Sequence, residues 1–225
     1  MLNKNQNKTI ININKNIILL TMIFKQIEVG NMQNFCYIAA DEESKEAAII
    51  DAGFDPELLV EEAKKFGLKI KYILLTHNHY DHMQSTEILV QLTNAIVCIH
   101  KNDAQALHNL KIKTLEDNEE LNIGKIKIKL LHTPGHTPGS SCYLINNKLI
   151  TGDTLFVEAV GRVDLPGSDI KQMFNSLQKL KNLDENIEVY PGHDYGSIPH
   201  STISHEKQNN PYLKCRTFEE FSEIR

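Results

Sequence analysis

The stretch THNHYDH, residues 76–82, follows directly after the apolar run KYILL. It places three histidines and an aspartate within six positions, whereas a single histidine beside an apolar segment is usually a structural residue. In an extended segment, side chains two residues apart point the same way, so His77 and His79 can bind one metal ion together. Asp81 and His82 follow where the chain turns into a helix, and they can face a second ion. The stretch therefore predicts a metal site at the carboxyl end of a buried strand.

Three later stretches combine a strand-like run with a polar residue in a turn bounded by Gly or Pro, where loops held by a rigid scaffold can aim functional side chains. They are HTPGHTPGS at 132–140, TGDTLF at 151–156 and YPGHDYG at 190–196. We expect His136 to complete the first site and His193 to complete the second. Asp153 has two carboxylate oxygens and is suited to bridge both ions. Imidazole and carboxylate ligands suit Zn²⁺, and also Fe or Mn, so the donor set predicts two divalent ions without fixing the metal.

The segments around these motifs alternate between strand and helix patterns. We predict strands at 22–29, 34–40, 46–52, 71–76, 95–99, 125–133, 140–146, 148–152 and 187–190, and helices at 55–67, 83–92, 101–110, 169–183 and 201–209. The helix that follows Asp55 is well marked, because Pro56 stands at its first position and Gly67 ends it. Two similar halves, 22–110 and 120–205, predict an α/β fold in which two sheets pack face to face with helices outside.

Composition and charge argue against some classes of binding partner. The chain of 225 residues has 24 basic and 29 acidic residues in mixed order, which argues against a nucleic-acid partner. The cysteines, Cys36, Cys98, Cys142 and Cys215, form no CxxC pair, which indicates a reducing cytoplasm rather than a disulfide framework. The longest apolar run near the N-terminus, IILLTMIF, is too short to span a bilayer, so we expect no membrane partner.

The first residues differ in composition from the rest, because they are mostly Asn, Lys and Ile and no acidic residue precedes Glu28. We expect folded structure to begin near Met22, which could be the true initiator. Residues 1–21 would then be an extension that is disordered or adds an edge strand. The predicted domain covers 22–213, followed by a tail at 214–225. An intact mass of the native protein that matched the full chain would refute the Met22 start.

The four motifs THNHYDH, HTPGHTPGS, TGDTLF and PGHDYG resemble, in order and spacing, those of the metallo-β-lactamase superfamily, over about 22–213. Within it, the chain is most similar to the glyoxalase II type, the hydroxyacylglutathione hydrolases, in a short form without their C-terminal helical domain. The resemblance implies an αββα sandwich of two mixed β-sheets flanked by helices, with a dinuclear metal site. It implies two ligand sets and a bridge: His77, His79 and His136; Asp81, His82 and His193; and Asp153. His132 matches no ligand, and we expect it to shape the turn.

The implied reaction is hydrolysis of a thioester such as a hydroxyacylglutathione by a hydroxide held between the metals. Asp81 would orient this hydroxide and receive its proton. Arg162, in VGRVDLPGSD, matches a basic residue that binds the glutathione carboxylate, and Tyr195 matches a tyrosine that touches the thiol peptide. The alternative for these two is a surface arginine paired with Asp164 and a tyrosine packed in the turn.

The motifs are also compatible with a second function. The HDY sequence at 193–195 resembles the signature of persulfide dioxygenases, which use one iron held by two histidines and an aspartate. Another hydrolase of the superfamily is a further alternative. In each case the predicted partner is a small molecule, for the hydrolase an acyl-thiol, and a homodimer is compatible with the sequence.

Overall fold

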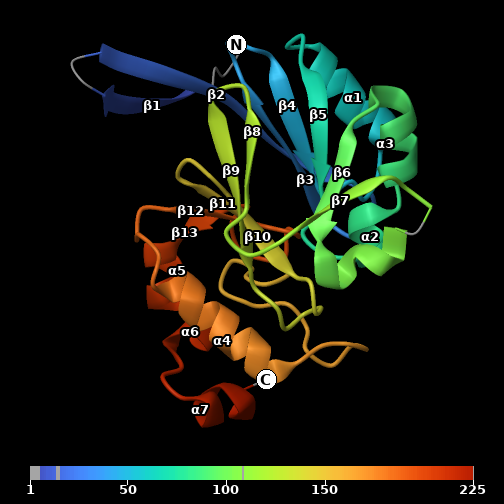
Figure 1. Ribbon diagram of the computed structural model, residues 1–225. Coiled ribbons are helices and arrows are strands. Elements are labelled where there is room, and N and C mark those ends of the chain that lie inside the picture. The colour runs from blue at the N-terminus through green and yellow to red at the C-terminus, as the bar shows by residue number, and fades with distance from the viewer. Residues whose placement is uncertain (1–5, 14–15, 108, 225) are drawn as a thin grey trace.

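Two mixed β-sheets pack face to face at the centre of the protein, with helices on the outer face of each (Figure 1). The computed structural model describes residues 6–13, 16–107 and 109–224. The first sheet has the order β1-β2-β3-β4-β5-β6-β7, antiparallel from β1 to β4 and parallel from β4 to β7. Its strands are β1 Gln6–Ile13, β2 Asn16–Val29, β3 Asn34–Asp41, β4 Glu46–Ile50, β5 Lys69–Leu74, β6 Ile96–His100 and β7 Ile112–Leu115.

The second sheet has the order β13-β12-β11-β10-β9-β8. All of its neighbouring strands are antiparallel except β11 and β12, which are parallel. Its strands are β8 Glu120–Ile123, β9 Ile126–His132, β10 Ser141–Ile145, β11 Lys148–Gly152, β12 Glu188–Pro191 and β13 Ser201–Thr202.

Helices cover both outer faces and connect the strands. They are α1 Pro56–Lys64, α2 Tyr80–Met83, α3 Thr86–Thr93, the 3₁₀ helix η1 Lys101–Leu107, α4 Ile170–Lys181, α5 Ile203–Asn209, α6 Pro211–Lys214 and α7 Phe218–Glu223. Helix α1 starts with Pro56, whose missing N–H is no loss at a first helical position, and the chain turns at Gly67 with a positive φ of 66°. Among the described residues, no helix is long and apolar enough to cross a membrane.

The core has three apolar layers because the strands are buried on both faces. In β3, Tyr37 and Ala39 face the second sheet, while Cys36 and Ile38 face the helices, as the two-residue period of a strand requires. Helices α1 and α3 pack on the first sheet. Helix α4 supplies Leu177 and other apolar residues to the layer outside the second sheet.

Several segments differ in detail from their sequence-based prediction. The helix predicted at 83–92 is α3, which begins at Thr86 and is preceded by the short helix α2, and the helix predicted at 101–110 is the 3₁₀ helix η1. The segment predicted as a tail contains α7, whose Phe221 is buried in the same layer as Leu213. Of the predicted extension, residues 1–5 and 14–15 lie outside the described residues. The backbone of 6–13 forms β1, and the hairpin of β1 and β2 projects beyond the body of the sandwich (Figure 1).

Backbone hydrogen bonds bring the predicted motifs to one edge of the sandwich. The N–H of Ser141 donates to Thr76 O at 2.9 Å, which joins the start of β10 to the first motif. The N–H of Gly192 donates to Gly152 O at 2.9 Å, and its own carbonyl accepts from Phe35 N at 2.8 Å. Segments far apart in the chain, such as those of Phe35 and Gly192, therefore meet at this edge.

Candidate metal centre

Seven side chains converge at this edge in three overlapping groups, each with its ligand atoms within 4.8 Å of one another. They are the seven residues that the sequence predicts as ligands. The groups are His77, His79 and His136; His77, His82 and Asp153; and Asp81, His82 and His193. His132 belongs to none of them.

Asp153 lies between the two three-residue ligand sets predicted from the sequence. Its Oδ1 is 3.3 Å from His82 Nε2, and its Oδ2 is 3.5 Å from both His136 Nε2 and His193 Nε2. One carboxylate therefore reaches histidines of both sets, which is the placement a bridging ligand needs.

Main-chain carbonyls fix the orientation of two of these imidazoles. His136 Nδ1 lies 2.8 Å from Arg162 O, and His193 Nδ1 lies 3.0 Å from Met32 O. A carbonyl can only accept a hydrogen bond, so each Nδ1 carries a proton, and the neutral ring then has its lone pair on Nε2. Such a partner on the other ring nitrogen is typical of histidines that bind metals.

Asp51 orients the imidazoles of the first motif. Its Oδ2 is 3.0 Å from His82 Nδ1 and accepts the hydroxyl proton of Thr76 at 2.8 Å. Because that proton is used on Asp51, the Thr76 oxygen is free to accept from His77 Nδ1, 3.0 Å away. Both rings then direct Nε2 into the site.

The inward-facing nitrogens fit a metal better than they fit each other. His77 Nε2 and His136 Nε2 are buried and have no hydrogen-bond partner among the described residues, which is costly for a polar atom. His82 Nε2 and His193 Nε2 face one another at 3.1 Å, so a proton or a cation has to stand between two lone pairs. The seven residues thus form a donor set suited to divalent metal ions.

The pKa values show how the metal-free site balances its charge. Burial lowers the pKa of His77, and it lowers that of His79 to about 4, with nearby histidines adding to the effect. Burial also opposes charge on His193, but hydrogen bonds to Asp153 and Asp81 outweigh it and raise its pKa to about 9.

The pKa values of the other charged residues in the site reflect the same balance between burial and neighbouring charges. The pKa of His82 is raised, because the charges of Asp153 and Asp51 exceed the effect of burial. Burial alone would raise the pKa values of Asp81 and Asp153, yet contacts with His193 and His82 hold both well below their usual range. The raised pKa values of His82 and His193 therefore favour protonation in the place where metal ions would bring positive charge.

Close packing at Gly192 helps to shape the site. A Cβ at this position would lie 2.3 Å from Asp153 Oδ1 and 2.9 Å from His82 Cε1. Only glycine lets the backbone approach the Asp153 carboxylate so closely.

Three supporting residues were not predicted: Asp51, Asn34 and Asp103. Asn34 Nδ2 donates to Asp81 Oδ2 at 2.9 Å and to the Asp81 carbonyl at 3.2 Å, which fixes the carboxylate. Asp51 directly follows β4 and precedes Ala-Gly, a pattern much like that of Asp153 after β11, so the same signal could have identified it. Asn34 and Asp103 had no comparable signal.

The predicted substrate residues lie at the rim. The Arg162 guanidinium, with 65% of its side chain exposed, forms two 2.9 Å bonds with the Asp164 carboxylate. Tyr195 is 52% exposed and its ring stacks on His193 at 4.5 Å, with Phe156 packed edge-on at 5.5 Å. His132 Nε2 lies 2.9 Å from Pro138 O, across the turn that carries His136.

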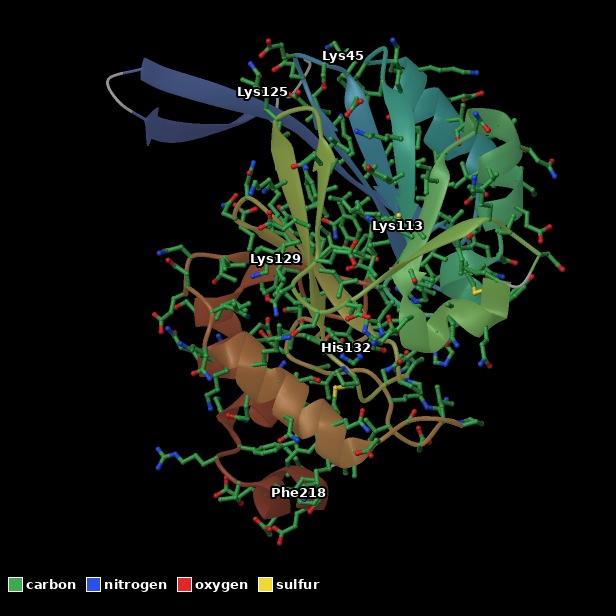
Figure 2. All side chains as sticks on the ribbon, viewed as in Figure 1. Lys45, Lys113, Lys125, Lys129, His132 and Phe218 are labelled. Carbon is green, nitrogen blue, oxygen red and sulfur yellow. The ribbon has the colours of Figure 1, made fainter. Side chains whose placement is uncertain are left out.

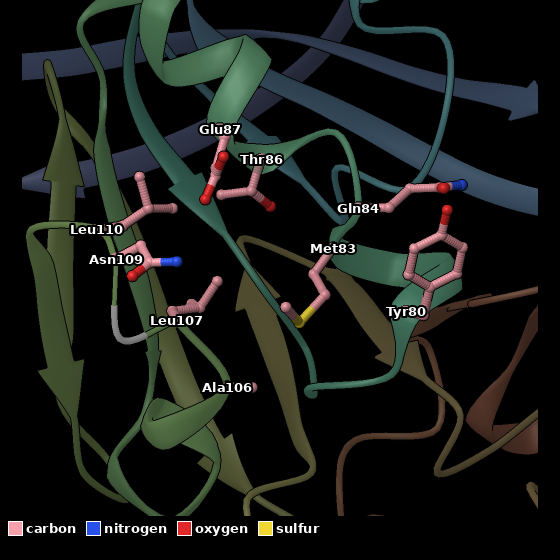
Figure 3. A pocket seen from close by; sticks show the side chains of 9 residues that line it. All are labelled: Tyr80, Met83, Gln84, Thr86, Glu87, Ala106, Leu107, Asn109 and Leu110. Atoms are coloured by element: carbon pink, nitrogen blue, oxygen red, sulfur yellow. The ribbon is translucent and has the colours of Figure 1, made fainter.

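A hollow of about 280 Å³ lies beside helix α2 (Figure 3). Met83, Leu107 and Leu110 give it apolar walls, and Tyr80, which is 72% exposed, stands at its border. Tyr80 directly precedes the ligand Asp81, so this hollow adjoins the helix that carries part of the second ligand set.

The chain belongs to the metallo-β-lactamase superfamily, because the family model of that description matches residues 29–193. It is 33% identical over 195 residues to a probable polyketide biosynthesis zinc-dependent hydrolase, PksB, of Bacillus subtilis, covering 85% of this chain and 87% of that protein. It is 31% identical over 215 residues to the human mitochondrial persulfide dioxygenase ETHE1, covering 92% and 80%. It is also 31% identical over 212 residues to the hydroxyacylglutathione hydrolase GloC of Haemophilus influenzae, covering 85% and 98%.

Solved structures show the same fold. The crystal structure of ETHE1 from Myxococcus xanthus superposes with a TM-score of 0.83 at 30% identity, covering 90% of this chain and 89% of that one. The di-iron-bound form of TTHA1623 gives 0.72 at 32% identity, covering 84% and 99%. The predicted αββα sandwich is thus confirmed. The relatives include hydrolases and a dioxygenase, so the glyoxalase II type is one of several to which the chain is similar.

Proposed function

We propose that the chain is a metal-dependent hydrolase of thioesters, such as hydroxyacyl-thiol conjugates, with two divalent metal ions. The observation that carries the proposal is the position of Asp153, whose two oxygens reach histidines of both ligand sets. A single ion could be held by two histidines and Asp153, but it would leave the complete set of Asp81, His82 and His193 on the other side of that carboxylate without a role. Hydrolase names among the relatives agree with this proposal.

The two sets would each hold one ion, His77, His79 and His136 for the first and Asp81, His82 and His193 for the second, with Asp153 shared. When bound, such ions activate water at neutral pH and polarise a carbonyl. Zinc suits the donor set, and iron or manganese would also fit. A thioester suits the site because a thiolate leaves readily and needs no acid from the protein.

Asp81 has the role of orienting water. Its lowered pKa keeps it ionised at neutral pH, so it can accept a hydrogen bond, and Asn34 holds its carboxylate in place. A carboxylate with so low a pKa binds a proton weakly, so orientation is the stronger part of its proposed role. Its role as a proton acceptor remains a prediction.

The rim would recognise the thiol part of the substrate. Arg162 presents a planar guanidinium that can bind a carboxylate with two hydrogen bonds, as it does with Asp164. Tyr195 and Phe156 give an aromatic wall beside His193. An anionic acyl-thiol would thus have its carboxylate at Arg162 and its body against the aromatic rings.

The free state of Cys36, Cys98, Cys142 and Cys215 agrees with a cytoplasmic location.

A persulfide dioxygenase with a single iron is the second candidate. It is favoured by the HDY sequence at 193–195 and by the similarity to human ETHE1 over 92% of the chain. The two candidates differ in the number of metals and in the need for Asp81, His82 and His193 as one intact set.

The experiment is elemental analysis of protein purified without added metal, together with two assays. The hydrolase predicts two metal equivalents per chain and turnover of S-lactoylglutathione without oxygen. A dioxygenase predicts one iron and oxygen consumption with glutathione persulfide.

Variants sharpen the comparison. His193→Ala should remove one metal equivalent and abolish hydrolysis, whereas His132→Ala, in a histidine outside the ligand sets, should leave both intact. One iron per chain and oxygen consumption that survives His193→Ala would refute the hydrolase.

A further inference from the structure

We infer that Asp103 is a positioning residue that holds the first ligand set together, by tying the loop of His77 and His79 to the turn of His136. The inference rests on the proposed metal centre. Asp103 lies in η1, outside all four motifs, and is 1% exposed. Its carboxylate contacts none of the seven ligands in the described contacts and acts through their neighbours in the chain.

Three hydrogen bonds converge on this carboxylate from two separate loops. Its Oδ2 accepts from Asn78 N at 3.1 Å and from the hydroxyl of Thr137 at 2.6 Å. Its Oδ1 accepts from Gly139 N at 2.8 Å. Asn78 stands between His77 and His79, and Thr137 follows His136, so the carboxylate binds a residue adjacent to every member of the first set.

The approach of this carboxylate to the turn is close. A Cβ at Gly139 would lie 2.4 Å from Asp103 Cγ, so a side chain there would displace the carboxylate. The neighbouring Asn102 adds a second link from η1, because its Nδ2 donates to Pro138 O at 3.2 Å. The motif HTPGHTPGS thus has its second glycine where the carboxylate must reach the main chain.

The second ligand set has different supports. His82 is held by Asp51, Asp81 by Asn34 and His193 by Met32 O. None of these three contacts involves Asp103. Loss of the Asp103 carboxylate should therefore weaken the first set and leave the second nearly unchanged.

Asp103→Asn is the sharpest perturbation because it keeps the shape of the side chain. An amide has one accepting oxygen, so its NH₂ group must face either Gly139 N–H or Asn78 N–H, and one of these two backbone hydrogen bonds is lost. The fold should persist, because Ser141 N still donates to Thr76 O where the strand ends meet.

Zn²⁺ binding to the metal-free protein, in competition with a chromophoric chelator, gives the readout without relying on activity. The substitution is placed in two backgrounds: His193→Ala, which retains the first set, and His136→Ala, which retains the second. We expect Asp103→Asn to raise the Kd about 10-fold in the first background, the lower end of the effect seen for residues that hydrogen-bond metal-binding histidines directly, and to change it less than about twofold in the second. Thr137→Val, which removes one of the three bonds, should give a smaller shift in the same background.

Asp117→Asn is the matched control. Its carboxylate also accepts a backbone N–H from this turn, that of His132 at 2.8 Å, but His132 is in neither set. Equal losses in both backgrounds, equal losses in the control, or no loss with Asp103→Asn and Thr137→Val would each overturn the inference. If the wild type binds no Zn²⁺, the metal centre and the proposed hydrolase are refuted together with the role of Asp103. If the wild type binds Zn²⁺ and only the variants fail to behave as expected, the role of Asp103 alone is refuted.

Discussion

Asp51→Asn tests whether a single carboxylate sets the protonation of the histidines in the first motif. Asp51 accepts three bonds: Thr76 N at 2.7 Å on Oδ1, and Thr76 Oγ1 at 2.8 Å and His82 Nδ1 at 3.0 Å on Oδ2. Asparagine can place its oxygen at only one of the two positions. With oxygen toward Thr76 N, its NH₂ group faces His82 Nδ1 and favours the tautomer with the proton on Nε2, which then cannot bind a metal.

The size of the effect follows from the bond that is lost. A hydrogen bond to a charged group contributes about 1.5 to 3 kcal/mol, which corresponds to about 10- to 150-fold in an equilibrium constant. We therefore expect the Kd of the second metal to rise by about this factor. Hydrolytic kcat/KM should fall at least as far at limiting metal concentration, because the site is then incompletely filled.

The assay is chelator competition with Zn²⁺, followed by turnover with excess metal. Asp41→Asn is the control, since Asp41 is also buried and accepts backbone N–H groups, including that of Lys125 at 3.2 Å. Figure 2 shows Lys125 at the opposite end of the sandwich from His132. A second-metal Kd in Asp51→Asn that stays within about twofold of the wild type would refute the reasoning.

Three further outcomes follow from the geometry. Asp153→Ala should lower metal content toward one equivalent or less and reduce turnover more than about 100-fold, because a direct ligand outweighs an indirect one; full occupancy by elemental analysis would contradict the bridge. Arg162→Ala should raise KM for an anionic thioester about fivefold, with kcat unchanged, and an unchanged KM would leave Arg162 only its pairing with Asp164. Because the metal-free pKa of His193 is about 9, above its ordinary 6.5, its charge stabilises the metal-free protein below pH 6.5 and that contribution is lost as pH rises through 9. Metal must displace this proton, so Zn²⁺ binding should release protons at pH 7 and tighten toward pH 9, and calorimetry in buffers of different ionisation enthalpy that showed no release would exclude His193 as a ligand.

The candidate ligands could be predicted because each is a metal-binding residue type in a turn or short helix that follows the end of a strand. The residues that hydrogen-bond to these side chains could not be predicted, because their contacts join distant segments of the chain. Asp51 and His82 are 31 residues apart, and Asn34 and Asp81 are 47 apart. Nothing near Asn34 in the sequence indicates that its amide will meet a carboxylate from another strand end.

The secondary structure was likewise predictable only in part. The long strands and α1 were predictable from periodicity and from Pro56 and Gly67. The start of α3 at Thr86 was not, because the pattern of 83–92 continues without a break, whereas Ser85 N bonds to Ala52 O and separates α2 from α3. Strands β7 and β8 have four residues each, too few for a period to be recognised.

Arg162 has two chemically independent groups near the site, its main-chain carbonyl and its side-chain guanidinium. Its carbonyl accepts a hydrogen bond from His136 Nδ1, while its guanidinium is exposed and pairs with Asp164. Because every amino acid has the same carbonyl, exchange of the side chain alters what the rim selects without disturbing the imidazole beneath it. If Arg162 binds substrate as proposed, substrate preference can be changed at the very position whose carbonyl orients His136.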